Sequence, residues 1–124
     1  MSEAPASPDV MIELMKVIED RRDNPPEKSY TTSLFKGGTT AIGAKIDEEA
    51  AEVIEAADES GEEGRQHLIR EAADLVYHLM VMLGHRHASW SEVESELGRR
   101  FGISGIDEKA SRAKPSSSDA SSSQ

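Results

Sequence analysis

Two short acidic segments constrain this chain more than any other feature of its sequence. Each reads acid, alanine, alanine, acid, from Glu49 to Glu52 in the first and from Glu71 to Asp74 in the second. Both lie in stretches whose apolar residues recur at helical spacing, and side chains three apart on a helix lie on the same side of it. Two such pairs facing each other would offer four hard oxygen ligands, which suit Mg²⁺. The sequence therefore predicts a helical protein with a magnesium site, and Mg²⁺ in turn suits phosphate chemistry.

The length and composition narrow the class of protein further. The chain has 124 residues, enough for one domain with a modest core, and its lack of cysteine excludes disulfides, thiolate zinc sites and cysteine catalysis. No stretch approaches the roughly 18 apolar residues of a membrane span, and the N-terminus lacks the basic-then-apolar pattern of a signal peptide. We therefore expect a soluble, cytoplasmic protein with no membrane partner.

The charge argues against nucleic acid as a partner. Acids outnumber Lys and Arg by 24 to 14, which gives a formal net charge of −10. No basic cluster is dense enough to follow a phosphate backbone. An acidic protein can still bind a phosphorylated small molecule when metal ions screen the repulsion. The composition thus favours a metal-dependent site, although acids also scatter over solvated helix faces.

Apolar periodicity, capping residues and turn residues predict helices throughout and no strand. Ser60 to Gly64 is predicted to be a loop. A short helix is expected within 29–35, broken by Lys36-Gly37-Gly38, and this hydroxyl-rich stretch is interpreted equally well as a cover over a substrate or as a plain connection. A capping box, Ser89-Trp90-Ser91-Glu92, opens the last helix. The four main helices are expected at 9–22, 41–59, 65–87 and 90–101.

This pattern predicts an all-α, four-helix-bundle-like fold. Because the outer helices are short and the third is apolar nearly all round, a homodimer is the simplest way to complete the core. We expect a flexible N-terminus over 1–8, one all-α domain over 9–104 and a disordered serine-rich tail over 105–124.

The two acidic helices differ in how strongly they indicate a site. On the first, acids and apolar residues occupy separate faces at about 100° per residue, so an ordinary helix with a solvated acidic face is an equal alternative. On the second, Glu71 and Asp74 lie on a narrow stripe between apolar surfaces, where carboxylates need a partner. A metal ion is the economical partner there. His78, one turn on, is interpreted as a packing residue, and His67 is not assigned to a metal site.

Three stretches carry a resemblance to a known family: Ser29-Tyr30-Thr31, Lys45 to Val53 and Glu71 to Leu79. They resemble the phosphoribosyl-ATP pyrophosphatases, a branch of the all-α nucleoside triphosphate pyrophosphatases, whose signature is Glu-Glu-x-x-Glu followed later by Glu-x-x-Asp. The similarity runs from about Val10 to Phe101. One departure is Asp47, which stands where the family usually has glycine and could tune metal affinity or simply face solvent.

The resemblance implies a particular activity. The activity is Mg²⁺-dependent hydrolysis of 1-(5-phosphoribosyl)-ATP to 1-(5-phosphoribosyl)-AMP and pyrophosphate, the second step of histidine biosynthesis. Glu48 would be an extra ligand or the catalytic group that orients water. The implied metal ligands are Glu49, Glu52, Glu71 and Asp74. The candidate substrate contacts are Ser29, Tyr30, Thr31 and Lys45.

Two alternatives remain at this stage. A housekeeping pyrophosphatase of the same superfamily would share the acids and act on non-canonical or deoxynucleotides. A non-enzymatic helical adaptor would carry the same acids merely as solvated charge.

Overall fold

The computed structural model describes residues 10–103, and within them the chain forms four helices and no strand. The all-α prediction is therefore confirmed, while the expected flexible ends, 1–8 and 105–124, lie outside the described residues. No helix within 10–103 combines the length and apolarity needed to cross a membrane. The helices are α1 (Val10–Asp23), α2 (Tyr30–Ala57), α3 (Gly61–His85) and α4 (Trp90–Phe101).

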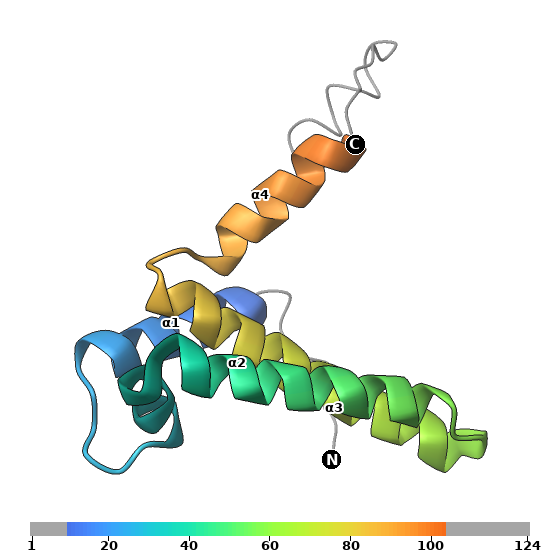
Figure 1. The fold of residues 1–124 in the computed structure, drawn as a ribbon. Helices are drawn as coiled ribbons and strands as arrows, with labels where there is room; N and C mark the ends of the chain where they lie inside the picture. The colour runs from blue at the N-terminus through green and yellow to red at the C-terminus, as the bar shows by residue number, and fades with distance from the viewer. Residues whose placement is uncertain (1–9, 104–124) are drawn as a thin grey trace, which may run out of the picture. The chain divides into compact units, whose positions relative to one another are not determined.

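The chain divides into two compact units, one ending at Ala88 and the other beginning at Ser89. In the first unit α2 and α3 run side by side, and α1 packs against both (Figure 1). Removing large apolar side chains from water drives this packing, with about 1.5–3 kcal/mol for each one fully buried. The buried apolar side chains come from all three helices: Met15, Ile18, Leu34, Ile42, Ala56, Met80 and Val81.

Gly84 allows α1 and the start of α2 to approach α3 closely. A Cβ atom there would lie 3.4 Å from Cγ2 of Ile18 and 3.5 Å from Cζ of Phe35. The carbonyl oxygen of Gly84 also accepts a hydrogen bond of 2.8 Å from Nη1 of Arg22, at the end of α1. This bond and the close packing fix α1 against α3.

A kink divides α2 into a short segment and a long one. Ser29 caps the short segment, because its Oγ accepts a hydrogen bond from the N–H of Thr32 at 3.2 Å. At Gly38 the backbone turns to φ 69° and ψ −157°, a conformation that favours glycine. The predicted short helix and its glycine break are therefore confirmed, and the long segment that follows ends at Ala57 rather than Glu59.

The turn between α2 and α3 is shorter than predicted. The sequence placed residues 60–64 in a loop, but α3 already begins at Gly61. Gly64 is buried, and a Cβ atom there would lie 2.6 Å from the carbonyl oxygen of Glu59. Gly64 thus serves close packing against the turn, and its predicted place in a loop was wrong. At the other end α3 stops at His85, slightly before the predicted end.

The second unit contains α4, whose start is as predicted. Oγ of Ser89 accepts from the N–H of Glu92, and the Glu92 carboxylate accepts from the N–H of Ser89 at 3.2 Å. This reciprocal pair is the predicted capping box. The helix ends where Gly102 adopts φ 67°.

Candidate active site

Three carboxylates from α2 and α3 meet where these helices pack together. Glu49 comes from α2, and Glu71 and Asp74 come from α3, with one oxygen of each within 4.8 Å of the others. The spacing of three residues places Glu71 and Asp74 on one side of α3. The fold thereby brings together three of the four residues predicted as metal ligands.

Glu49 is the buried member of this group. Glu49 is only 8% exposed, and its Oε1 atom has no hydrogen-bond partner within the described part of the chain. Burial, the contact with Glu71 and the negative charge of Asp74 together raise the pKa of the Glu49 carboxyl to about 7. A buried carboxylate beside like charges is unfavourable until a partner neutralises it. A cation bound to the three carboxylates would relieve this repulsion.

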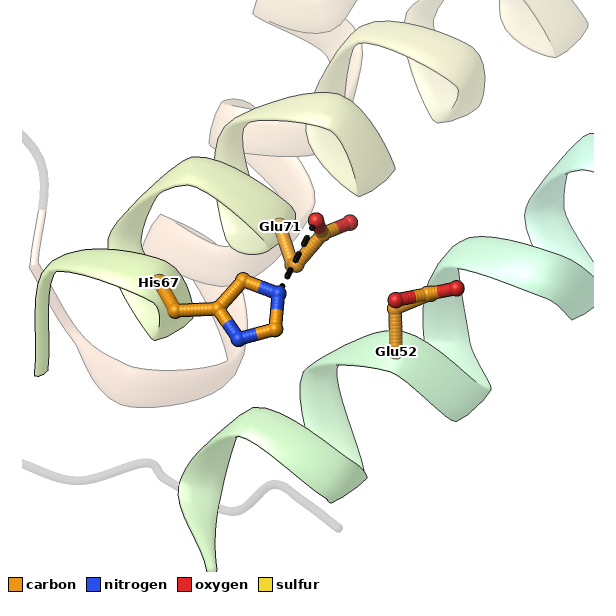
Figure 2. Close-up of side chains that lie close together, drawn as sticks. All are labelled: Glu52, His67 and Glu71. Atoms are coloured by element: carbon orange, nitrogen blue, oxygen red, sulfur yellow. Dashed lines mark ion pairs between the residues drawn. The ribbon is translucent and has the colours of Figure 1, made fainter. Parts of the chain in front are cut away.

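The fourth predicted ligand, Glu52, belongs to an adjoining group. It lies with Glu71 and His67, and the three offer ligand atoms within 4.8 Å of one another. Figure 2 shows Glu52 on α2 facing the two α3 side chains, with Nε2 of His67 3.3 Å from Oε2 of Glu71. Because Glu71 belongs to both groups, the two form one continuous acidic site along the α2–α3 interface.

Sequence reasoning missed His67 as part of the site. The available signal was its spacing of four residues from Glu71, which places the two side chains together on a helix. Nδ1 of His67 also donates to the Glu59 carboxylate at 3.0 Å, and this bond raises the pKa of the imidazole. The contact with Glu59 depends on the tight turn between α2 and α3, where the sequence had predicted a longer loop.

Glu48 and Lys45 form a separate pair on α2. Nζ of Lys45 donates to Oε1 of Glu48 at 3.2 Å, and this bond raises the pKa of the lysine ammonium. Glu48 is exposed and belongs to neither ligand group, and Asp47 beside it is exposed as well. The predicted catalytic acid thus lies next to Glu49 in the chain but outside the carboxylate cluster.

At the start of α2, Tyr30 is joined to α3 through His78. The Tyr30 hydroxyl donates to Nε2 of His78 at 2.8 Å, and Nδ1 of the same ring donates to the carbonyl oxygen of Asp74 at 2.9 Å. Burial raises the pKa of the Tyr30 phenol, which keeps this donor protonated. His78 is itself buried, so its interpretation as a packing residue is confirmed.

The two neighbours of Tyr30 make their hydrogen bonds within the protein. Oγ1 of Thr31 is hydrogen-bonded to the hydroxyl of Tyr77, and the Thr31 side chain is buried. Oγ of Ser29 caps α2. Both hydroxyls therefore fix the backbone on either side of Tyr30. Tyr30 itself is half exposed.

Known proteins resemble this chain over the whole of this site. Residues 11–101 match the model of the family described as phosphoribosyl-ATP pyrophosphohydrolase. The chain is 57% identical over 99 residues to the phosphoribosyl-ATP pyrophosphatase of Rhodopirellula baltica, covering 80% of this chain and 82% of that protein. It is 46% identical over 106 residues to the protein of the same name from Chromobacterium violaceum, covering 86% and 95%. A third such protein, from Geobacter sulfurreducens, is 47% identical over 105 residues, covering 84% and 94%. The chain therefore belongs to the phosphoribosyl-ATP pyrophosphohydrolase family and is a hydrolase.

Proposed function

We propose that this protein hydrolyses 1-(5-phosphoribosyl)-ATP to 1-(5-phosphoribosyl)-AMP and pyrophosphate, the second step of histidine biosynthesis, and that the reaction depends on Mg²⁺. The observation that carries this proposal is the buried carboxyl of Glu49. One of its oxygens lies within 4.8 Å of a carboxylate oxygen of Glu71 and of Asp74, and its Oε1 has no hydrogen-bond partner among the residues that the structure describes. Membership of a pyrophosphohydrolase family supports the reaction class, and the names of the relatives support the substrate.

The donor set fits a magnesium ion. Mg²⁺ binds oxygen ligands and is commonly held by a few carboxylates together with substrate phosphates. We assign Glu49, Glu71 and Asp74 to hold it, with Glu52 as the fourth carboxylate of the continuous site. When bound, Mg²⁺ supplies neutralisation of phosphate charge and alignment of the phosphates to be cleaved. The closeness of the three carboxylates, which is unfavourable without a cation, then becomes a source of affinity.

We assign the Lys45–Glu48 pair to the substrate side of the site. Lys45 would bind a phosphate oxygen of the nucleotide, because its ammonium is paired with Glu48, which precedes Glu49 in α2. A phosphate that takes hydrogen bonds from Lys45 would free Glu48 to accept one from the attacking water. Glu48 would then orient that water and receive its proton.

Tyr30 is the substrate contact that we assign at the start of α2. Tyr30 is 52% exposed, whereas its hydroxyl is fixed by the hydrogen bond to His78. An exposed aromatic face with a fixed edge suits a nucleotide base or ribose. Ser29 and Thr31, the other two candidates in this segment, would act by holding Tyr30 in place.

We further propose that the protein acts as a homodimer in the cytoplasm. A soluble nucleotide substrate supports the location. The dimer is supported by large apolar side chains that the first unit leaves exposed: Ile12, Val17, Ile54, Ile69 and Leu79. Burying them against a second copy would be favourable. Light scattering coupled to gel filtration would measure the mass in solution and so test the dimer.

The decisive test is a substrate panel. Pyrophosphate release would be measured with 1-(5-phosphoribosyl)-ATP, ATP and the deoxynucleoside triphosphates, each with Mg²⁺ and with EDTA. We expect turnover of 1-(5-phosphoribosyl)-ATP only, and only with Mg²⁺. Turnover of ordinary or modified nucleotides instead would assign the chain to a housekeeping pyrophosphatase role, and turnover of none would contradict the proposal.

A further inference from the structure

His78 is a buried histidine of α3 that the proposed metal site does not use. Both of its ring nitrogens have hydrogen-bond partners. Nε2 accepts from the Tyr30 hydroxyl at 2.8 Å, and Nδ1 donates to the carbonyl oxygen of Asp74 at 2.9 Å. A buried ring with both nitrogens occupied has no polar atom left to offer to a substrate. Any part that His78 takes in the reaction must therefore act through Tyr30.

Aromatic contacts fix the plane of the His78 ring as well. The ring stands edge-on to Tyr30, with centroids 5.9 Å apart and planes at 85°, and edge-on to Tyr77, at 5.1 Å and 78°. Edge-to-face pairs of this kind are favourable for aromatic rings. The Tyr77 hydroxyl is in turn hydrogen-bonded to Thr31, the residue after Tyr30. The three rings thus form one aromatic cluster that joins the start of α2 to α3.

Tyr30 lies near the side chains assigned to the phosphates. Burial raises the pKa of the Tyr30 phenol, the charge of Lys45 opposes that rise, and the charges of Glu49 and Glu48 add to it. Salt screens exposed charges over about 10 Å, so charges that act on the phenol belong to its neighbourhood. Because Tyr30 is half exposed, a nucleotide held by these residues would find part of its surface open.

The bonds of His78 make this surface a fixed one. A half-exposed side chain that had to be ordered when a ligand arrived would weaken the binding of that ligand. His78 removes this cost, because it holds the Tyr30 hydroxyl beforehand. Its second bond, to the Asp74 carbonyl, fixes the phenol relative to the helix that carries two of the proposed metal ligands. Contacts to the two ends of one nucleotide are thereby kept at a constant separation.

We propose that His78 is a positioning residue for nucleotide binding, which holds Tyr30 ready to contact the base or ribose while the carboxylate site serves the phosphates. The inference rests on the proposed function, because it takes Tyr30 as a substrate contact. His78 itself touches no part of the substrate. Its loss should weaken nucleotide binding and leave the rate of the hydrolytic step nearly unchanged.

Two substitutions of His78 separate its two hydrogen bonds. His78→Asn can place an amide donor near the position of Nδ1, where it keeps the bond to Asp74, but it is too short to reach Tyr30. His78→Gln can extend an amide oxygen toward the position of Nε2 and accept from the Tyr30 hydroxyl. His87→Asn is the matched control, because His87 is exposed and its φ of 58° is one that Asn tolerates.

The test measures binding and turnover separately. Calorimetry with Mg²⁺ would give the Kd of the product, 1-(5-phosphoribosyl)-AMP, and steady-state kinetics would give KM and kcat for 1-(5-phosphoribosyl)-ATP. We expect His78→Asn to raise Kd and KM by about 3- to 10-fold, the cost of ordering one side chain on binding. Its kcat should stay within about twofold of the wild type. His78→Gln should recover most of the affinity, and His87→Asn should match the wild type.

A double-mutant cycle excludes a general packing defect. Tyr30→Phe removes the same hydrogen bond without altering the buried imidazole, so it keeps the test valid even if circular dichroism shows that His78→Asn is unfolded. It should weaken binding as His78→Asn does, and the double variant should lose nothing further, because both changes remove one bond. Additive losses, wild-type affinity in both single variants, or a fall in kcat with unchanged KM would overturn the proposal.

Product binding separates this inference from the proposed function. A wild-type protein that binds 1-(5-phosphoribosyl)-AMP but releases no pyrophosphate would contradict the proposed function, and the variants would still decide the role of His78. Full turnover by the wild type, with product affinity unchanged in Tyr30→Phe and His78→Asn, would overturn the inference alone. A wild-type protein that does not bind the product would overturn the inference as well, since Tyr30 would then have no nucleotide to contact.

Discussion

The hydroxyl of Tyr30 donates to Nε2 of His78 across 2.8 Å, which joins the start of α2 to α3. The other nitrogen of the ring donates to the carbonyl oxygen of Asp74. Because a carbonyl oxygen can only accept, Nδ1 carries the proton, and Nε2 of the neutral ring is left to accept from the phenol. These two bonds link the proposed substrate contact, Tyr30, to the backbone of a proposed metal ligand, Asp74.

Removing this link should destabilise the protein without unfolding it. Tyr30→Phe deletes the donor and leaves Nε2 of a buried imidazole without its partner, so we expect the free energy of unfolding to fall by about 1 kcal/mol. Urea denaturation would measure it. The control is Ser33→Ala, which removes an exposed local bond to the Tyr30 carbonyl and should change stability by less than about 0.5 kcal/mol. Equal denaturation midpoints for the two variants would show that the link to His78 contributes nothing.

Glu49 should make the metal-free protein less stable as the pH rises. Its pKa is about 7 in the folded protein, against an ordinary value of 4.5. Between these values the folded state holds more protons than the unfolded state, so stability is fully present below pH 4.5 and declines as the pH rises through 7. After allowance for solvent screening at the exposed side of the cluster, the loss should be about 1 kcal/mol.

Glu49→Gln removes the titrating carboxyl, so it tests directly whether ionisation of Glu49 lowers the stability of the metal-free protein. In EDTA at pH 8 the variant should be more stable than the wild type, whereas at pH 4.5 the difference should largely disappear. Mg²⁺ should then raise the melting temperature of the wild type at pH 8 but not that of the variant. Glu55→Gln, which changes an exposed acid on the same helix, should follow the wild type in all three conditions. A Glu49→Gln protein that is less stable than wild type in EDTA at pH 8 would refute the electrostatic account of this cluster.

Gly64 should be more sensitive to substitution than its surroundings. In Gly64→Ala the new Cβ would meet the Glu59 carbonyl oxygen at 2.6 Å, and relieving that contact requires the α2–α3 turn to shift. We expect a loss of about 1–3 kcal/mol in the free energy of unfolding, as for other overpacked sites. The neighbouring Ser60→Ala is the control, because the Ser60 side chain makes no capping hydrogen bond. Comparable thermal stability in the two variants would mean that the turn is not as tightly packed as its geometry indicates.

The helices were largely predictable because their signals are local. The capping box at Ser89 and Glu92 depends on residues three apart, and the break at Gly38 follows from a conformation that favours glycine. The α2–α3 turn was not predictable in the same way. Glycine is needed at position 64 because a side chain there would meet the Glu59 backbone. In the sequence, a glycine needed for such packing looks the same as a glycine in a loop.

The candidate site shows the same division between local and long-range information. The spacing within each acidic segment was enough to predict that Glu71 and Asp74 share a side of α3, and the structure brings Glu49 to them. The burial of Glu49 and the position of Glu52 beside His67 depend on how α2 lies along α3. The sequence separates the acidic face of this helix from its apolar face, but the neighbouring helix decides whether Glu49 is exposed.

The measurement that tests the central claim most directly is the rate of Mg²⁺-dependent pyrophosphate release from 1-(5-phosphoribosyl)-ATP by Glu49→Gln and Glu55→Gln. Both variants remove one negative charge from α2, but only Glu49 lies in the carboxylate cluster. The account predicts that Glu49→Gln loses at least about 100-fold in kcat/KM, in the range of losses seen when a major electrostatic group is removed from an active site. It predicts that Glu55→Gln stays close to the wild type. Equal rates for the two variants, both near that of the wild type, would contradict the claim that the Glu49 cluster carries the reaction.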